Sequence, residues 1–156
     1  MRFFLSLLFI CIFSIVNGQN DEIKNTNHIF FEGMQTGDTV TLKKSIHKSL
    51  TLQTVFLNKE GKGVLKNQTK EQFLKLVSSK KKENTWFEKL LSYKINIDGD
   101  LATVWMPYEF YFNEKFSHCG TNSFQLFKNN GHWEIISIVD TRRIENCNLL
   151  KDKYLN

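Results

Sequence analysis

Proline and cysteine are both scarce in this sequence, which has one proline and three cysteines among 156 residues. Without proline-rich or low-complexity stretches there is no linker to separate two domains, and no internal repeat is visible. Histidine spacings such as HxH or HExxH are also absent, so we expect no metal site. The lysines are spread along the chain and cluster only at Lys80–Lys82. We therefore expect no nucleic-acid partner, although the net charge is +5.

The N-terminus has the layout of a secretory signal peptide. The segment MRFFLSLLFICIFSIVNG carries one arginine, then an apolar run, and ends in small or polar residues. We expect cleavage after Gly18, which leaves residues 19–156 as a single domain that is periplasmic or secreted. A membrane anchor is the alternative, but the apolar run is shorter than the roughly 20 residues that a spanning helix needs. Lipid attachment at Cys11 is disfavoured because Ile10 occupies the position where a small residue is expected.

Hydrophobic spacing predicts an α+β chain in which helices come first and a long antiparallel meander follows. Helices are expected at residues 21–35, 39–48 and 70–79, the second capped by Asp38 and the third by a Thr69/Gln72 capping box. Strands are expected at residues 50–57, 64–67, 89–97, 101–112, 117–127 and 132–140, with a hairpin turn at Asp98–Asp100. Because proline has no N–H to donate, Pro107 predicts a bulge or bend within its strand.

Two segments resemble the nuclear transport factor 2-like superfamily. They are FFEGMQTGD near the start of the mature chain and IDGDLATVWMPYEFYFNEKFSHCGTNSFQLFKNNGHWEIISIVDTRR in its second half. More narrowly, the chain is similar over residues 21–147 to the exported bacterial branch labelled lumazine-binding or SnoaL-like. The resemblance implies a cone-shaped α+β fold in which N-terminal helices pack on a strongly curved antiparallel sheet. It also implies a deep apolar pocket and frequent dimers. The superfamily includes ketosteroid isomerases, dehydratases and cyclases, but also many proteins with no known reaction, so fold alone does not give function. No flavin or pteridine motif is present, and we expect no cofactor.

The adjacent residues His118 and Cys119 raise the question of a catalytic pair. Strand alternation places them on opposite faces, whereas a Cys–His dyad needs the base within hydrogen-bond reach of the sulfur, so a dyad is disfavoured. We expect the next hairpin to use a three-residue loop, residues 129–131. The expected pairs are then Lys128 with His132, Phe124 with Ile136, Gly120 with Asp140 and His118 with Arg142. A two-residue Asn130-Gly131 turn is the alternative, and it shifts the register by one residue.

In the three-residue register, His118, Asp140 and Arg142 share a face with Phe124, where they would form a polar site at one end of an apolar pocket. The expected pocket residues are Trp105, Tyr108, His118, Phe124, Asp140 and Arg142. His118 and Asp140 are the candidate general bases of an isomerase-like site, with Tyr108 or Tyr111 as the oxyanion donor. The alternative is a structural network in which Asp140 pairs with Arg142 and His118 satisfies a backbone group.

Cys119 and Cys147 are the two cysteines that remain after signal cleavage. In an oxidising compartment such an isolated pair usually forms a disulfide, which here would tie the C-terminal tail to the sheet. We expect an exported small-molecule-binding or accessory domain without catalytic activity, which takes a small apolar or aromatic ligand. A homodimer through the outer sheet face is also expected, and no membrane span remains after signal cleavage. The alternatives are a small isomerase- or dehydratase-like enzyme, and a structural or partner-binding protein whose cone is filled by side chains.

Overall fold

The computed structural model describes the backbone of residues 2–155 and the side chains of residues 18–154. The helices are α1 (Arg2–Thr36), α2 (Thr39–Lys43), α3 (Lys70–Ser78) and α4 (Cys147–Leu155). The strands are β1 (Ile46–Leu57), β2 (Gly63–Thr69), β3 (Trp86–Leu90), β4 (Lys94–Asp98), β5 (Leu101–Phe112), β6 (Lys115–Asn129) and β7 (His132–Arg142). The order confirms the expected α+β class, with a fourth helix added at the end.

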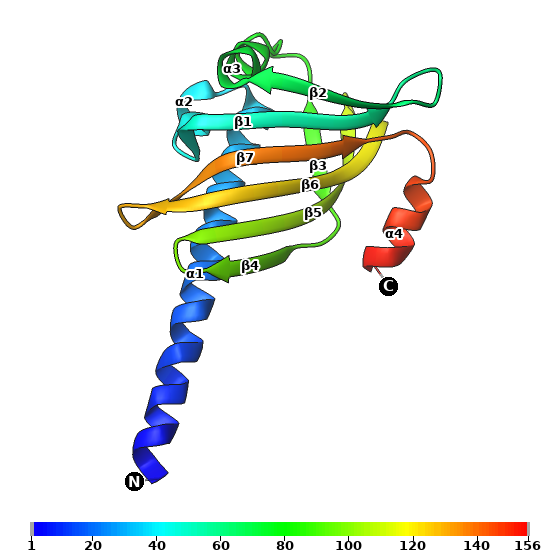
Figure 1. Ribbon diagram of the computed structural model, residues 1–156. Coiled ribbons are helices and arrows are strands. Elements are labelled where there is room, and N and C mark those ends of the chain that lie inside the picture. Colours follow the sequence, from blue (N-terminus) through cyan, green and yellow to red (C-terminus); the bar gives the residue numbers. More distant parts are fainter. Residues whose placement is uncertain (1, 156) are drawn as a thin grey trace.

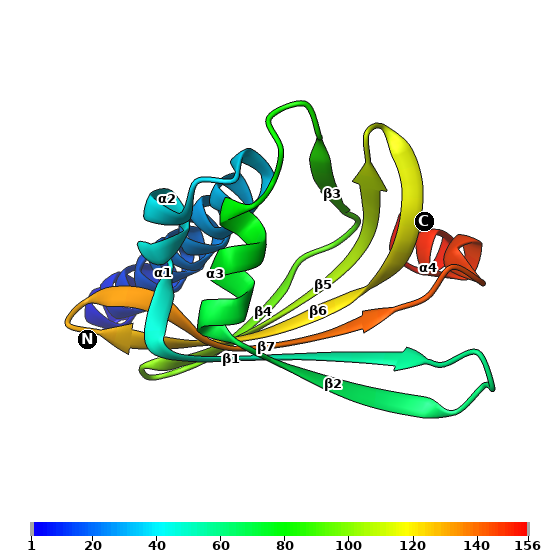
Figure 2. The same ribbon diagram turned by 90° about the horizontal axis from the view of Figure 1, so that it is seen from above.

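All the strands form one seven-stranded sheet in the order β2-β1-β7-β6-β5-β3, and β4 also pairs with β5. Every pairing is antiparallel except the parallel contact between β1 and β7, so the sheet is mostly, not wholly, antiparallel. Helices α1, α2 and α3 lie against one face, which we call the inner face (Figure 1). In the view from above, β5 and β6 curve strongly away from the plane of the other strands, so the sheet forms one wall of a cone (Figure 2).

The main core fills the space between α1 and the inner face. Phe30 makes ring contacts with Phe31, Phe73 and Phe124 at centroid distances of 5.2–5.7 Å. Gly33 permits the close approach of α2, because a Cβ on this residue would lie 2.6 Å from the backbone nitrogen of Leu42. The helices therefore close the narrow end of the cone with a packed aromatic cluster.

Local helix signals in the sequence agree with the structure at two caps. The Asp38 side chain accepts hydrogen bonds from the amides of Val40 and Thr41 at the start of α2. The capping box of Thr69 and Gln72 is present at the start of α3. However, α2 ends at Lys43 and not at residue 48. Strand pairing takes over at this point, because the Ser45 carbonyl accepts the amide of Ile135 and β1 begins at Ile46.

The strand expected at residues 89–97 is divided into β3 and β4, which both pair with β5. Between them, the amide of Leu91 bonds to the carbonyl of Pro107, and Leu91 packs with Cys119 on the outer face of the sheet. Tyr93 packs against the main core instead, so Leu91 and Tyr93 face opposite sides, which a single regular strand over residues 89–97 would not allow. The division lies opposite Pro107, which has no N–H to donate to a partner strand at that point.

A bulge at Pro107, which the sequence allows as the alternative to a bend, is not present. Pro107 pairs with Thr121 in regular register, and the irregularity between β5 and β6 falls at Phe110/Tyr111. A proline is tolerated here because its carbonyl bonds to Leu91 while its missing N–H falls at the break between β3 and β4.

The β6–β7 hairpin uses the two-residue turn, so the expected three-residue loop is wrong. Asn129 pairs with His132, and both Asn130 and Gly131 have positive φ angles, 49° and 86°. Such turns match the right-handed twist of the flanking strands, which favours them over a longer loop. A register shift at Gln125/Leu126 then places Phe124 opposite Ile138, and Asn122 opposite Asp140.

Candidate ligand-binding cavity

The wide end of the cone contains a cavity of about 1310 Å³. Its walls come from α1, α3 and the inner faces of β1, β2, β3, β5, β6 and β7. The apolar lining is largely aromatic and includes Phe30, Phe31, Phe56, Phe73, Trp86, Phe110, Phe112 and Phe124. A concave, mostly apolar space with a few polar groups is the usual form of a small-molecule site.

Asp140 is the centre of the polar groups in this cavity. Its side chain is 9% exposed and accepts hydrogen bonds at both oxygens. Thr54 donates to Oδ1 at 2.7 Å, while the Nε of Arg142 donates to Oδ2 at 2.7 Å. The Tyr108 hydroxyl lies 3.3 Å from Oδ2 and 3.0 Å from the carbonyl oxygen of Thr141. Burial and the neighbouring carboxylates raise the pKa of Tyr108 above its ordinary value, so this phenol remains protonated.

Glu88 is a second carboxyl group in the cavity, and it is not among the pocket residues expected from the sequence. It lies on β3 and accepts a hydrogen bond from the Nδ2 of Asn122 on β6. Burial raises the pKa of Glu88 to about 8; the hydrogen bond from Asn122 opposes this shift and the charge of Asp140 adds to it. At neutral pH Glu88 is therefore mainly an uncharged acid. Its position between Trp86 and Leu90, which face the same side, is the one sequence signal that could have identified it.

His118 lies at the edge of the same cavity, against aromatic rings. Its imidazole centroid is 5.0 Å from that of Phe110 and 5.8 Å from that of Tyr108. Burial lowers the pKa of His118 to about 4, and the positive charge of Arg142 contributes to this shift. The side-chain hydrogen bond found for the imidazole is with Ser117, at 3.1 Å. In the described part of the chain no hydrogen bond joins His118 to Asp140, so the two are neighbours and not a bonded dyad.

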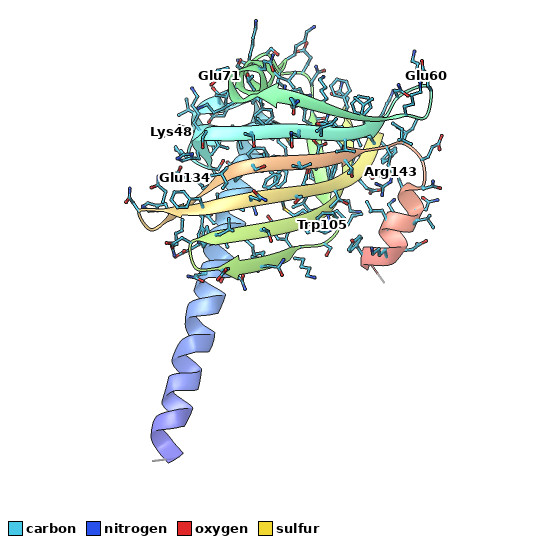
Figure 3. The ribbon with its side chains drawn as sticks, in the orientation of Figure 1. Lys48, Glu60, Glu71, Trp105, Glu134 and Arg143 are labelled. Atoms are coloured by element: carbon cyan, nitrogen blue, oxygen red, sulfur yellow. A yellow bond between two sulfur atoms is a disulfide. The ribbon has the colours of Figure 1, made fainter. Side chains whose placement is uncertain are left out.

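Five of the six residues expected in the pocket line this cavity: Tyr108, His118, Phe124, Asp140 and Arg142. Trp105 does not. It is 45% exposed, and its Nε1 lies 3.3 Å from the Tyr154 hydroxyl of α4 (Figure 3). Its placement in the pocket was wrong because Val104 and Met106 face the core on either side of it, so strand alternation directs Trp105 outward.

The outer face carries the disulfide between Cys119 and Cys147, whose Cα atoms are 5.9 Å apart. It holds α4 against β6, where Leu150 packs with Cys119 and Leu91. Glu109, which is only 2% exposed, pairs with Lys151 of α4 at 2.9 Å and accepts the hydroxyl of Tyr111 at 3.0 Å. Tyr111 therefore serves the outer face and not the cavity. His118 and Cys119 thus belong to two separate sites on opposite faces.

The described residues contain no group of three or more His, Cys, Asp or Glu side chains arranged to hold a metal ion. None of the helices in this part of the chain has the length and apolar character that a membrane crossing requires.

Sequence comparison identifies one family for this chain. A family model described as "Putative lumazine-binding" matches residues 18–139. Among curated proteins, none matches the chain.

Solved structures with the same fold are numerous and distant in sequence. A nuclear transport factor 2-like protein of unknown function from Shewanella baltica has a TM-score of 0.59 at 14% identity, covering 81% of this chain and 94% of that one. A "putative dehydratase" of the same fold from Streptomyces avermitilis has a TM-score of 0.58 at 10% identity, covering 82% and 98%. The association domain of CaMKII from Caenorhabditis elegans has a TM-score of 0.61 at 18% identity, covering 80% and 95%. At these identities the likeness shows the fold alone.

Proposed function

Since the chain belongs to the family described as "Putative lumazine-binding", within the nuclear transport factor 2-like superfamily, we propose that it is a small-molecule-binding domain. The observation that carries the proposal is the open cavity of about 1310 Å³, with aromatic walls and polar groups gathered around Asp140. This volume accommodates a drug-sized or larger ligand. It also argues against the alternative of a cone filled by its own side chains.

The proposed ligand has a flat or apolar body and a polar end. The body would contact the aromatic lining, because ring stacking and burial of apolar surface both favour such a partner. The polar end would meet Asp140, Glu88 and Arg142, which bind and orient it. In this proposal Asp140 is held in place by Thr54 and Arg142, so it is a fixed acceptor for a donor group on the ligand.

N-phenylnaphthylamine, a neutral fluorescent dye, tests this function. We expect it to bind with increased fluorescence, and we expect Ile138→Trp, which places an indole in the cavity, to abolish binding. Val139→Trp is the matched control, because it adds the same side chain to the next residue of β7, on the outer face. Circular dichroism checks that both variants are folded. Equal binding by the two folded variants would place the dye outside the cavity and contradict the proposal.

Proton-transfer catalysis is a second candidate function. Two carboxyl groups share one cavity, and Glu88 holds its proton at neutral pH while Asp140 lies in an ion pair with Arg142. A proton donor and a carboxylate base at one site are the groups that an isomerase or dehydratase needs. A "putative dehydratase" among the proteins of similar fold is consistent with this alternative. In it Asp140 is the base, and His118, which the sequence analysis paired with it, is a neutral neighbour.

Export and dimerisation are further parts of the proposal. The disulfide fits an oxidising compartment, while the side chains of residues 1–17 lie outside the described residues. We propose that residues 19–156 are the mature single domain. Intact-mass measurement of the exported protein should give a chain that starts at Gln19 and carries no free thiol. We also propose dimerisation through the outer sheet face, and sedimentation equilibrium should give twice the monomer mass.

A further inference from the structure

We propose that the cavity takes an organic anion: an aromatic or apolar molecule with a carboxylate, sulfate or phosphate group held by Arg142 and Lys66. This inference rests on the proposed small-molecule function and specifies the chemical class of its ligand. Three observations support it: the unused donors of Arg142, the alignment of Lys66 with the polar groups of the cavity, and the balance of charges on the lining.

Arg142 has donors that the protein does not use. Its Nε bonds to Asp140 at 2.7 Å, yet the side chain is still 53% exposed. In the described part of the chain, this is the one hydrogen bond found for its guanidinium group. A guanidinium has five N–H donors in a planar fork, and its two terminal amino groups match the two oxygens of a carboxylate or phosphate. Asp140 therefore fixes Arg142 in place while leaving its terminal amino groups free for a ligand.

Lys66 lies in line with these groups across the sheet. On β2 it pairs with Thr54 of β1, and Thr54 in turn pairs with Asp140 of β7. Residues that pair directly across neighbouring strands point to the same face, so all three face the cavity, and all three are among its lining residues. Lys66 makes no ion pair with any described residue. Its ammonium group is therefore available at the side of the cavity formed by β1 and β2.

The lining as a whole has an excess of positive charge. Its basic residues are Lys59, Lys66, Arg142 and Arg143, and its acidic residues are Glu88, Asp140 and Glu145. Asp140 is already paired with Arg142, and burial keeps Glu88 mostly protonated at neutral pH because its pKa is about 8. Of the remaining groups, Arg143 pairs directly with Cys119 and so points to the outer face. Lys59 and Lys66 are then left with the single unpaired carboxylate of Glu145. A cleft of one sign with low-dielectric walls concentrates ligands of the opposite sign.

A pair of dyes with the same aromatic body tests the charge directly. Anilinonaphthalene sulfonate carries a sulfonate, whereas N-phenylnaphthylamine does not. At pH 7 and low salt, we expect the sulfonate dye to bind at least about tenfold more tightly, with this preference falling as salt is added. Lys66→Gln and Arg142→Gln should each weaken the sulfonate dye by about five- to tenfold and change the neutral dye by less than about twofold.

Lys62→Gln is the matched control for Lys66→Gln. Lys62 immediately precedes β2, the strand that carries Lys66, but it does not line the cavity, and its exposed side chain pairs with Glu60 at 3.1 Å. Its substitution should leave the affinities of both dyes unchanged. Lys66→Gln is the decisive variant, because Arg142→Gln also disturbs Asp140. The Ile138→Trp protein should bind neither dye, which separates cavity binding from adsorption to surface lysines.

The pH dependence gives an independent measure. Glu88 faces Asp140 and Arg142 of β7, Tyr108 of β5 and Asn122 of β6. Raising the pH from 7 to 9 ionises Glu88 and adds a negative charge to the cavity. The affinity for the sulfonate dye should therefore fall, while the affinity for the neutral dye should stay unchanged. Glu88→Gln should remove this fall.

The outcomes distinguish this inference from the proposed function. If both dyes bind in the cavity with equal affinity, or if Lys66→Gln behaves like Lys62→Gln, the anion preference is wrong and the small-molecule function stands. If neither dye binds, or if Ile138→Trp leaves binding of both intact, the proposed function itself is wrong.

Discussion

Glu88 is a carboxyl group whose protonation is coupled to folding. Its pKa is about 8 in the folded protein and ordinarily 4.5. Between these values the folded state holds the proton and the unfolded state has lost it, so the free energy of unfolding falls as pH rises. His118 acts in the opposite direction: with its pKa lowered from 6.5 to about 4, it makes stability rise with pH over that interval. Above pH 6.5 His118 therefore no longer opposes the effect of Glu88 on the free energy of unfolding.

This difference can be measured by urea unfolding at pH 6.5 and 8.5. Between these pH values the free energy of unfolding of the wild-type protein should fall by about 1–2 kcal/mol relative to that of Glu88→Gln, which has no proton to lose. Comparison with the variant removes the contribution of all other titrating groups. Parallel pH profiles for the two proteins would show that Glu88 ionises normally in the folded state.

Gly120 is required by the close approach of β6 and β7. A Cβ on this residue would lie 1.7 Å from the carbonyl oxygen of Thr141 and 3.0 Å from the ring of Tyr108. Because the nearest atom belongs to the backbone, no side-chain rotation relieves the clash. We expect Gly120→Ala to lower the free energy of unfolding by more than about 3 kcal/mol. Gly63→Ala is the control: no atom lies within 4 Å of its Cβ, so its effect should stay within about 0.5 kcal/mol. Similar urea midpoints for the two variants would contradict this account.

At the scale of elements, the β6–β7 hairpin shows what the sequence could and could not predict. The two-residue turn shifts the register by one, and the shift at Gln125/Leu126 adds a second residue. Because a change of two restores the facing, Phe124 still shares a face with Asp140, although it is opposite Ile138 and not Ile136. Five cavity residues could therefore be predicted from alternation alone. The register shift at Gln125/Leu126 leaves no local signal in the sequence. The residue pairs between β6 and β7 could therefore not be predicted.

Glu88 was missed for a related reason. Its polar partner Asn122 lies 34 residues away on a strand that is not its neighbour, and only the curvature of β5 and β6 brings the two together. Local residue types and spacings identify helix caps, as at Asp38 and Thr69. They do not report how strongly a sheet bends, which is set by packing across the whole inner face.

Helix α4 depends on its covalent link to the sheet. Its described apolar contacts with the outer face come from Leu150, which packs with Leu91 and Cys119, and from the partly buried Tyr154. The disulfide spans 28 residues of sequence, and closing a loop of this length contributes typically about 2–4 kcal/mol. We expect Cys147→Ser to lower the free energy of unfolding by that amount and to make α4 sensitive to trypsin at Lys151 and Lys153. A variant whose α4 stays resistant to trypsin would show that the noncovalent contacts suffice.

The whole molecule has a packed end and an open end, and this division gives a prediction for hydrogen exchange. Segments of β5, β6 and β7 that pack against α1 contain the fully buried residues Val104, Leu126 and Ile135, so their amides should exchange slowest. Strand β3 lies at the edge of the sheet and lines the cavity with Trp86 and Glu88. Its amides should exchange sooner, because none of its residues is fully buried and it pairs with only one described strand, β5.

Binding of N-phenylnaphthylamine should then slow exchange in β3 selectively. Strand β4 is the internal control: it also pairs with β5, but none of its residues lines the cavity. A ligand that fills the open end contacts β3 and does not contact β4. Any ligand that binds only the folded state also slows the exchange of amides that exchange by global unfolding, in every strand. Equal protection of β3 and β4 would contradict a selective contact of the ligand with β3. Protection confined to β3 would locate the ligand at the open end of the cone, beside Glu88.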